Sequence, residues 1–420
     1  MQILYTVIYV IGTCMMIALY AYGFFYLYTA LHAYKKVPKI KESEIKKRFA
    51  VLIPARNEAG VIGALIASLQ KQKYPKELYD IIVIPNNCTD NTEQAAAEAG
   101  AKIMKCRGSV KSKGEVLSDI FDQLIHMSES EYDAVLIFDA DNLVHPEFIA
   151  KMNDALMSGA MVAQGYRDSK NPSDTWVSGC HSVYYYIVNG FFNRARMALG
   201  WSAALNGTGF MISTQLLKEH PFETYSMTED IEYSSIVISR YKEKIMWVPD
   251  AVTYDEQPLL FSESVTQRRR WTVGTVQCFK RYARTLLKNT FKDKNMSCLD
   301  MFVLYSAPYM QIAGLVPVLM TVAAFIHMTV LSIAEQYLLL FLGGSILSTL
   351  GCYAATMIAV CLVLKLEHKP IKPHWKAIFG FGIFLLSWLP IGIWALIHPK
   401  CHWREIKHTR SVDLDELMNG

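Results

Sequence analysis

The sequence lacks paired cysteines and a strong charge of either sign. Its nine cysteines include no CxxC pair, which excludes a disulfide framework and a zinc site and agrees with a reduced, cytosolic compartment. The net charge is only +4, and the basic clusters flank apolar segments, where lipid head groups account for them. We therefore expect no nucleic-acid partner. The sequence also contains no internal repeat and no low-complexity stretch.

Charged residues are missing from long stretches of the chain. Residues 3–31 and 377–397 contain none, and residues 301–364 contain only Glu335. Each stretch is long enough to cross about 30 Å of hydrocarbon as a helix. We therefore expect a multi-pass protein of the cell membrane, with the lipid bilayer as a partner.

The first apolar stretch is too long for the core of a secretory signal peptide, and its start carries no basic residue. Four lysines follow it between residues 35 and 41. We therefore expect residues 1–34 to form an uncleaved N-terminal transmembrane helix. The positive-inside rule then predicts that the chain after this helix lies in the cytosol.

The C-terminal part is expected to form transmembrane helices over residues 300–398, followed by a basic tail over residues 399–420. The basic loop "KLEHKPIKPHWK" and the tail both favour the cytosolic side, which conflicts with a single crossing by residues 377–398. Pro390 lies inside that block, so a re-entrant or interfacial helix is an alternative. The number of spans and the side of the C-terminus therefore stay open.

Residues 49–294 have the pattern of a soluble α/β unit, with interfacial helices at its end. The runs "FAVLIPA", "YDIIVIP" and "YDAVLIF" predict buried strands, and "EAGVIGALIASLQKQ" between the first two has helical spacing. Strands that alternate with helices are typical of a doubly wound, nucleotide-binding sheet, whose ligands lie at the carboxyl ends of the strands. Polar groups follow these ends, at Arg56-Asn57-Glu58, Asn86-Asn87 and Asp139/Asp141.

Two acidic groups and one basic group could carry chemistry. Asp139 and Asp141 follow a predicted strand and could hold Mg²⁺ or Mn²⁺ and a diphosphate, or could only stabilise a turn. Glu229 and Asp230 in "TEDIEY" could point into a cleft, or could only favour a helix N-terminus. In "TQRRRW", guanidinium groups could bind a diphosphate while Trp271 stacks on a sugar. The same stretch could instead be an interfacial helix with its tryptophan in the aromatic belt.

The order of these groups is more specific than any one of them. A strand-end acidic pair, then TED, then QxxRW, then membrane helices resembles the processive family-2 glycosyltransferases, which include cellulose, chitin, hyaluronan and poly-N-acetylglucosamine synthases. The resemblance covers about residues 49–275 and the membrane layout. It implies an α/β nucleotide-sugar transferase (GT-A) fold in a cytosolic domain fused to an α-helical transmembrane region. It also implies Mg²⁺ or Mn²⁺ as the cofactor.

The resemblance also assigns roles to residues of this chain. Asp230 matches the catalytic base, and Asp139 and Asp141 match the metal-binding pair. The nucleotide-sugar-binding residues would be Pro54, Asn57, Glu58, Asn86, Lys113, Asp139, Asp141, Gln267, Arg268 and Arg270. The acceptor-binding residues would be Gly207, Thr208, Glu229 and Trp271. The family usually has an aspartate where this chain has Asn86, and an amide there can still hydrogen-bond a base.

These assignments predict a membrane-embedded, inverting and processive transferase. It would polymerise a β-linked polysaccharide from UDP-glucose or UDP-N-acetylglucosamine onto a growing glycan acceptor and export it. Transfer of a single sugar to a lipid is the main alternative, and a transporter with a regulatory nucleotide domain is a further one. A region of about four spans is small for a channel, so an accessory membrane subunit or a homo-oligomer is an additional candidate partner.

Overall fold

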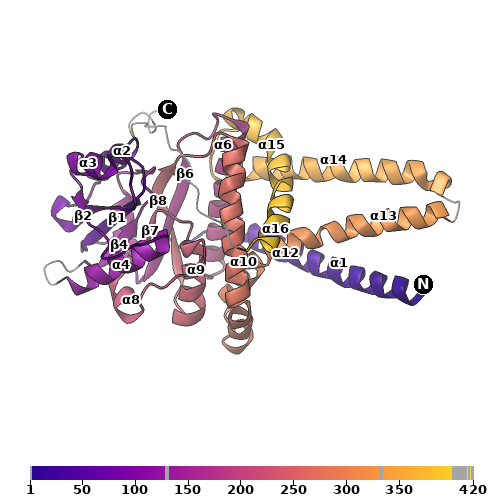
Figure 1. Ribbon diagram of the computed structural model, residues 1–420, viewed down its shortest axis with the longest axis horizontal. Coiled ribbons are helices and arrows are strands. Elements are labelled where there is room, and N and C mark those ends of the chain that lie inside the picture. Colours follow the sequence, from indigo (N-terminus) through magenta and orange to yellow (C-terminus); the bar gives the residue numbers. More distant parts are fainter. Residues whose placement is uncertain (1, 128–131, 331–333, 400–413, 415–416, 418–420) are drawn as a thin grey trace.

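The computed structural model describes residues 2–127, 132–330, 334–399, 414 and 417. A sheet covered by helices forms one end of the molecule, and long apolar helices form the other (Figure 1). Most of the basic tail predicted at residues 399–420 lies outside the described residues.

Eight strands form one mixed sheet in the order β3-β2-β1-β4-β7-β6-β8-β5. The strands are β1 Phe49–Ala55, β2 Tyr79–Pro85, β3 Lys102–Ile103, β4 Ala134–Ile137, β5 Leu143–Val144, β6 Val162–Ser169, β7 Phe210–Ser213 and β8 Ile245–Asp255. The first four run parallel, as the strand-helix alternation predicts, whereas β7 is antiparallel to both β4 and β6. Only the part β3-β2-β1-β4 therefore has the parallel arrangement of a doubly wound sheet.

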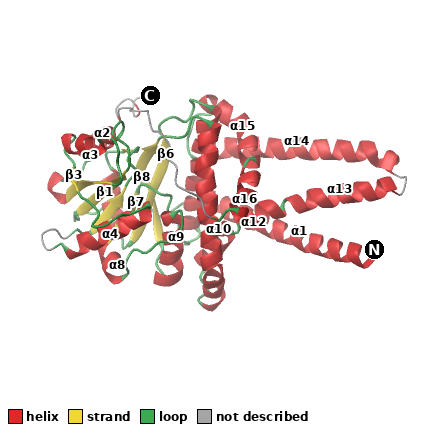
Figure 2. Ribbon diagram, in the orientation of Figure 1, coloured by secondary structure: helices red, strands yellow, loops and turns green. Residues whose placement is uncertain are grey.

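Sixteen α-helices are described. They are α1 Gln2–Leu31, α2 Ile62–Gln70, α3 Thr92–Glu98, α4 Lys113–His126, α5 Phe148–Met157, α6 Trp176–Ile187, α7 Ala195–Ala198, α8 Thr214–Glu219, α9 Glu229–Ile236, α10 Phe261–Lys292, α11 Met296–Tyr305, α12 Ala307–Ala313, α13 Leu315–Val330, α14 Ala334–Leu366, α15 Trp375–Leu386 and α16 Trp388–Ile397. Figure 2 shows how the helices enclose the sheet and then extend away from it.

The predicted strand β1 is buried on both faces of the sheet. Val51 and Ile53 pack into one core cluster, with α2 and α5. Leu52, one residue away, packs into the opposite cluster, with α4 and α9. Because successive side chains of a strand point to opposite faces, a continuous apolar run is what a strand with two covered faces requires.

Three helices are long and apolar enough to cross a membrane, within Tyr9–Tyr34, Leu342–Leu366 and Lys372–Ile397. A fourth span is present if α11 and the following helices, bent by 53°, are taken as one. α1 leaves large apolar side chains such as Tyr20, Phe24 and Leu27 more than half exposed. Such a surface is unfavourable in water and favourable in lipid.

The last helix pair takes a different direction from the other apolar helices. α1, α13 and α14 extend away from the sheet, whereas α15 and α16 run crosswise to α14, with α16 packed on α10 and α15 packed on α6 (Figure 1). Trp375, Phe379 and Ile383 are exposed at four-residue spacing on α15, so they form one apolar stripe. α10, α15 and α16 together form a layer between the sheet and the extended helices.

Candidate active site

The strand ends β1 and β2 bring four predicted residues together. Asn86 donates its backbone N–H to the carbonyl of Ala55 at 2.9 Å. Asn57 has a positive φ of 57°, and its side-chain oxygen accepts a hydrogen bond from the backbone N–H of Thr89 at 2.7 Å. The two loops are therefore tied to each other. Pro54, Glu58 and Asn86 are only partly buried beside them, as a ligand-binding edge requires.

Lys113 is the centre of an ion-pair network at the end of β4. Its Nζ lies 2.5 Å from Asp139 Oδ1, 2.7 Å from the carbonyl of Gly207 and 3.6 Å from Glu229 Oε1. Burial works against the lysine charge, but the carboxylates outweigh it and raise the pKa of Lys113 above its ordinary value. The network joins the acidic pair, the glycine-containing turn and the TED segment, which are far apart in the sequence.

Thr208 lies within this network rather than open to an acceptor. It is fully buried, and its hydroxyl accepts a hydrogen bond from the backbone N–H of Asp139 at 3.0 Å and donates one to Asn142. The hydroxyl therefore shapes the acidic loop, and the acceptor-binding role implied for it does not agree with this position. Its neighbour Gly207 has a φ of 87°, and a Cβ there would lie 3.4 Å from Asp230 Oδ2.

Asp230 lies in the first turn of α9. Burial raises the pKa of its carboxyl to about 7, and the charge of Glu229 adds to the rise. The backbone N–H of Ile231, Lys113 and Arg167 act in the opposite direction. A partly exposed carboxylate with a pKa near neutrality is suited to act as a general base.

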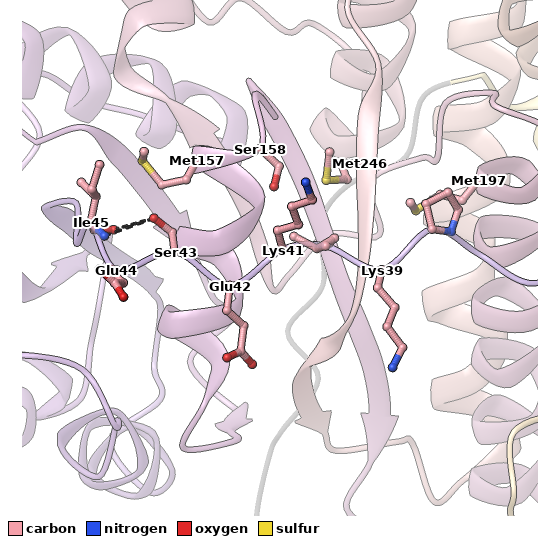
Figure 3. A pocket seen from close by; sticks show the side chains of 12 residues that line it. Lys39, Lys41, Glu42, Ser43, Glu44, Ile45, Met157, Ser158, Met197 and Met246 are labelled. Carbon is pink, nitrogen blue, oxygen red and sulfur yellow. Dashed lines mark hydrogen bonds between the residues drawn. The ribbon is translucent and has the colours of Figure 1, made fainter.

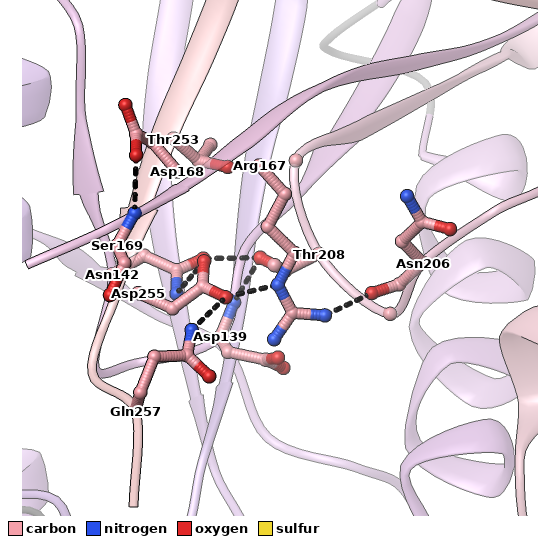
Figure 4. Close-up of polar contacts among 12 residues, drawn as sticks. Asp139, Asn142, Arg167, Asp168, Ser169, Asn206, Thr208, Thr253, Asp255 and Gln257 are labelled. Carbon is pink, nitrogen blue, oxygen red and sulfur yellow. Dashed lines mark hydrogen bonds and ion pairs between the residues drawn. The ribbon is translucent and has the colours of Figure 1, made fainter. Parts of the chain in front are cut away.

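Arg167 and Asp255 complete the site, and the sequence motifs did not identify them. Arg167 lies two residues before the end of β6. It hydrogen-bonds Asp255, at the end of β8, and the carbonyl of Asn206 (Figure 4). Its guanidinium lies 4.0 Å from the centre of the Tyr185 ring. Both charged residues follow uncharged strand segments, "VAQGY" and "AVTY". The signal in the sequence was therefore a charge near the end of each strand.

The acidic residues fit a divalent cation that is shared with a ligand. Burial raises the pKa of Asp255 to about 7, Arg167 opposes this, and the charges of Asp141 and Asp139 raise it further. Three carboxylates that repel one another are the oxygen donors that Mg²⁺ and Mn²⁺ prefer. Among the residues described, no group of three or more such side chains is arranged to hold a metal on its own. Ligand oxygens would therefore have to complete the coordination.

The arginines of "TQRRRW" lie on different faces of helix α10. Gln267, Arg270 and Trp271 share one face, as spacing of three and four residues requires, and are partly buried. Arg268 points elsewhere: it is fully buried, and its Nη1 donates to the carbonyl of Phe384 at 3.1 Å and to Ser387 Oγ at 2.7 Å. The diphosphate contact implied for Arg268 does not agree with this position, because its partners belong to the α15–α16 segment.

Trp271 lies in a group of aromatic rings, which we call the aromatic cluster: Tyr184, Tyr185, Trp271 and Trp388. The ring centre of Trp271 lies 5.8 Å from the ring centre of Tyr184, 6.1 Å from that of Tyr185 and 6.4 Å from that of Trp388. Burial raises the pKa of Tyr184 to about 12, Arg167 opposes this, and the charge of Asp230 adds to the rise. Arg167 links the cluster to the base: its guanidinium lies 4.0 Å from the centre of the Tyr185 ring, and its Nη1 lies 3.9 Å from the position of a Gly207 Cβ, which is 3.4 Å from Asp230 Oδ2. Trp388 belongs to α16 and was not identified from the sequence.

A separate cavity of about 760 Å³ opens along residues 38–45 (Figure 3). Its other lining residues are Met157, Ser158, Met197 and Met246. None of the carboxylates above lines it, so it belongs to the linker after α1 and not to the site.

Comparison with known proteins agrees with this geometry. Residues 47–274 match the family described as "Glycosyltransferase like family 2". The probable glycosyltransferase YdaM of Bacillus subtilis (strain 168) is 27% identical over 57% of this chain and 58% of its own. The beta-monoglucosyldiacylglycerol synthase of Nostoc sp. (strain PCC 7120 / SAG 25.82 / UTEX 2576) is 25% identical over 61% of this chain and 54% of its own. The chain thus spans little more than half the length of these relatives.

A solved structure supports the fold. The mannosyltransferase PcManGT from Pyrobaculum calidifontis, determined with GDP-Man and Mn²⁺, superposes with a TM-score of 0.59 at 16% identity. The match covers 88% of this chain and 99% of that one, and it confirms the predicted GT-A-like fold. The family match spans more than half of the chain and includes every predicted site residue. The protein is therefore a glycosyltransferase and belongs to glycosyltransferase family 2.

Proposed function

We propose that the protein transfers a sugar from a nucleoside diphosphate sugar to the hydroxyl group of a membrane lipid, with inversion at the anomeric carbon. The observation that carries this proposal is the position of Asp230. Its Oδ2 lies 3.4 Å from the position that a Cβ of Gly207 would take, and the carbonyl of Gly207 bonds Lys113 on one side. On the other side, Arg167 Nη1 lies 3.9 Å from the same position, and its guanidinium stacks on Tyr185 of the aromatic cluster, to which the membrane-side helix α16 contributes.

The donor would bind at the strand ends. Pro54, Asn57, Glu58 and Asn86 would line the nucleotide pocket, and UDP-glucose and UDP-N-acetylglucosamine are the donors to test first. The solved mannosyltransferase contains GDP-Man, so GDP-sugars belong to the same test. The side-chain Nδ2 of Asn206 and Oε1 of Gln267 are buried and have no hydrogen-bond partner among the described residues. They would be suitable partners for sugar hydroxyls.

Asp139 and Asp141 would hold Mg²⁺ or Mn²⁺, which would neutralise charge on the diphosphate. Lys113 and Arg270 would add positive charge on the same side as the leaving group. Asp230 would take the proton of the acceptor hydroxyl while its oxygen attacks the anomeric carbon and the bond to the diphosphate breaks. Since one displacement needs no carboxylate nucleophile, an α-linked donor would give a β-linked product.

The arrangement of the apolar helices supports a membrane orientation. α1, α13 and α14 would cross the bilayer, and α10, α15 and α16 would lie along its surface with the stripe of Trp375, Phe379 and Ile383 in the lipid. Both basic segments that flank α15–α16 would then lie on the same side. The positive-inside rule puts the catalytic domain, on that side, in the cytosol.

The acceptor is proposed to be a lipid because the three extended helices leave large apolar surfaces uncovered. Helices that enclosed a polysaccharide would instead cover one another. The beta-monoglucosyldiacylglycerol synthases among the relatives have names that agree with a lipid acceptor. Processive synthesis is the second candidate, favoured by Gln267, Arg270 and Trp271 on one face of α10. It would require an accessory subunit or a homo-oligomer to complete a channel.

The test is product analysis with purified protein in lipid nanodiscs. Radiolabelled UDP- and GDP-sugars are supplied with Mg²⁺ or Mn²⁺, and lipids are extracted and identified by mass spectrometry. The proposal expects a lipid carrying one sugar. A long polymer that stays in the aqueous phase would replace it with processive synthesis, and no transfer with any donor would reject both.

A further inference from the structure

The chain turns back into the protein where α14 ends. Lys369 donates its backbone N–H to the carbonyl of Leu364 at 2.8 Å, and His368 has a φ of 53°, as in a left-handed helix C-cap. This turn carries the side chain of Glu367 inward, where the residue is only 8% exposed. Residues 367–369, which we call the return turn, therefore pack against the catalytic domain.

The return turn holds two residues of β6. Lys369 Nζ lies 2.5 Å from Asp168 Oδ2, and the hydroxyl of Tyr186 lies 3.1 Å from Asp168 Oδ1. Lys369 Nζ also lies 5.9 Å from the centre of the Tyr166 ring. Glu367 Oε1 lies 3.5 Å from Arg194 Nη2, and burial raises the pKa of its carboxyl. The lysine and aspartate side chains are 23% and 13% exposed, less than one quarter each, so water screens this ion pair only partly.

Between these two residues lies Arg167. Because side chains alternate along a strand, Tyr166 and Asp168 face the return turn while Arg167 faces the active site. Arg167 hydrogen-bonds Asp255 and the carbonyl of Asn206. The residue after Asn206 is Gly207, beside the carboxylate of Asp230.

We propose that Lys369 is a positioning residue for the transfer reaction. It fixes the carboxyl end of β6 from the side opposite the active site. Arg167 passes that constraint to the Asn206–Gly207 turn beside the base. The first residues after α14 therefore determine the geometry of the end of β6, which lies about two hundred residues earlier in the chain. This inference rests on the proposed function.

The test compares Lys369→Gln, which removes the charge, with Lys369→Arg, which keeps it. Lys372→Gln is the matched control, because Lys372 is exposed in the same connection. We expect Lys369→Gln to lower kcat about tenfold and leave nucleotide affinity within about twofold, since a small misplacement at a reacting centre is costly. Lys369→Arg should restore most of the rate, and Lys372→Gln should match the wild type.

Hydrogen–deuterium exchange separates this inference from the proposed function. In Lys369→Gln, the amides of residues 205–208 should exchange faster while those of β1 keep the wild-type rate. If the wild type transfers no sugar, the proposed function fails, but the exchange comparison still tests the positioning. Unchanged kcat together with unchanged exchange at residues 205–208 would overturn the inference. A parallel loss of nucleotide affinity and of β1 protection would also overturn it, because the lysine would then only stabilise the fold.

Discussion

Burial and hydrogen bonding act in opposite directions on the carboxylate of Asp230. Desolvation and the charge of Glu229 raise its pKa to about 7, while the backbone N–H of Ile231 and the cations Lys113 and Arg167 limit the rise. A base with a pKa close to the working pH can accept a proton from a hydroxyl and still be ionised before the reaction. Asp230 therefore has two properties at once: it lies in the first turn of α9, where acidic residues are favourable, and its pKa suits a general base.

Asp230→Asn should lower transfer by a factor of about 10² to 10⁴ while leaving nucleotide affinity unchanged. The amide keeps the shape of the carboxylate and cannot accept the proton. Steady-state transfer and isothermal titration with UDP measure the two quantities. Asp250→Asn is the control, because Asp250 is an exposed carboxylate on β8. Transfer above one-tenth of the wild-type rate in Asp230→Asn would contradict the assignment of the base.

The pH dependence of the rate should follow the same carboxyl. Because the base must be ionised, kcat should fall as the pH drops below about 7.

The stability of the fold should show the opposite dependence on pH. The folded pKa is raised above the ordinary value of 3.8, so the stability that protonated Asp230 contributes is complete below about 4 and is lost as the pH rises through about 7. The Tm of Asp230→Asn relative to wild type should therefore be higher at pH 8 than at pH 5; an equal difference at both would refute the raised pKa.

At the scale of elements, α10 joins the candidate site to the apolar helices. One face carries Gln267, Arg270 and Trp271, of which Trp271 contacts Tyr184 and Tyr185, and another face buries Arg268 against α15–α16. Three adjacent arginines therefore do different work because a helix turns each one by about 100°. A run of like charge in a sequence cannot be assigned to one ligand before its helix face is known.

Trp271→Ala should weaken acceptor use and leave nucleotide affinity intact. Stacking of an aromatic ring contributes about 0.5–1.5 kcal/mol beyond its buried area, so the acceptor KM should rise about tenfold. Trp388→Ala should act in the same direction, because the two rings lie 6.4 Å apart. Kinetics on matched amounts of folded protein distinguish this from an anchoring role. An unchanged acceptor KM in both variants would contradict the acceptor-binding role of the aromatic cluster.

Gly274 sets the distance between α10 and α9. A Cβ at this position would lie 2.0 Å from Thr228 Oγ1, directly before Glu229 and Asp230. Gly274→Ala should therefore displace the N-terminus of α9 and lower kcat at least tenfold, at a stability cost of about 1–3 kcal/mol for the steric clash. Adding Thr228→Gly removes the three nearest atoms and should restore activity. A double variant no more active than Gly274→Ala would show that the clash is not the cause.

The sequence predicted the strand-end part of the candidate site better than the part formed by long-range contacts. Asn86 directly follows β2 and Asp139 lies two residues after β4. Both strands pair in parallel with β1, which brings their ends to one edge of the sheet, so local pattern was sufficient to predict their position. Arg167 and Asp255 meet only because β6 pairs with β8, and Trp388 joins the cluster only because α16 lies along α10. Those contacts depend on long-range pairing and helix direction, which no short motif encodes.

At the scale of the whole molecule, the direction of α15–α16 resolves a conflict between hydropathy and charge. Lys372–Ile397 is apolar enough to cross a membrane, yet the basic segments on both sides of it favour the cytosol. A helix pair that lies along α10 and exposes one apolar stripe satisfies both requirements. After α16, the carbonyl of Pro399 accepts a hydrogen bond from Gln277 on α10 at 2.8 Å, so the chain returns to the catalytic side.

This arrangement predicts the topology of the protein in cells. Reporter domains fused after residue 420 should be active only if the reporter requires the cytosol, and reporters inserted between α13 and α14 only if they require the opposite side. The catalytic domain, tagged between α3 and β3, should behave like the C-terminal fusion.

A crossing by Lys372–Ile397 would place the C-terminal fusion on the side opposite the catalytic domain. In that case α15–α16 would have to leave α10, and Arg268 would lose the carbonyl of Phe384 and the hydroxyl of Ser387. The surface arrangement keeps both hydrogen bonds of Arg268, which is why we expect the C-terminal fusion on the side of the catalytic domain.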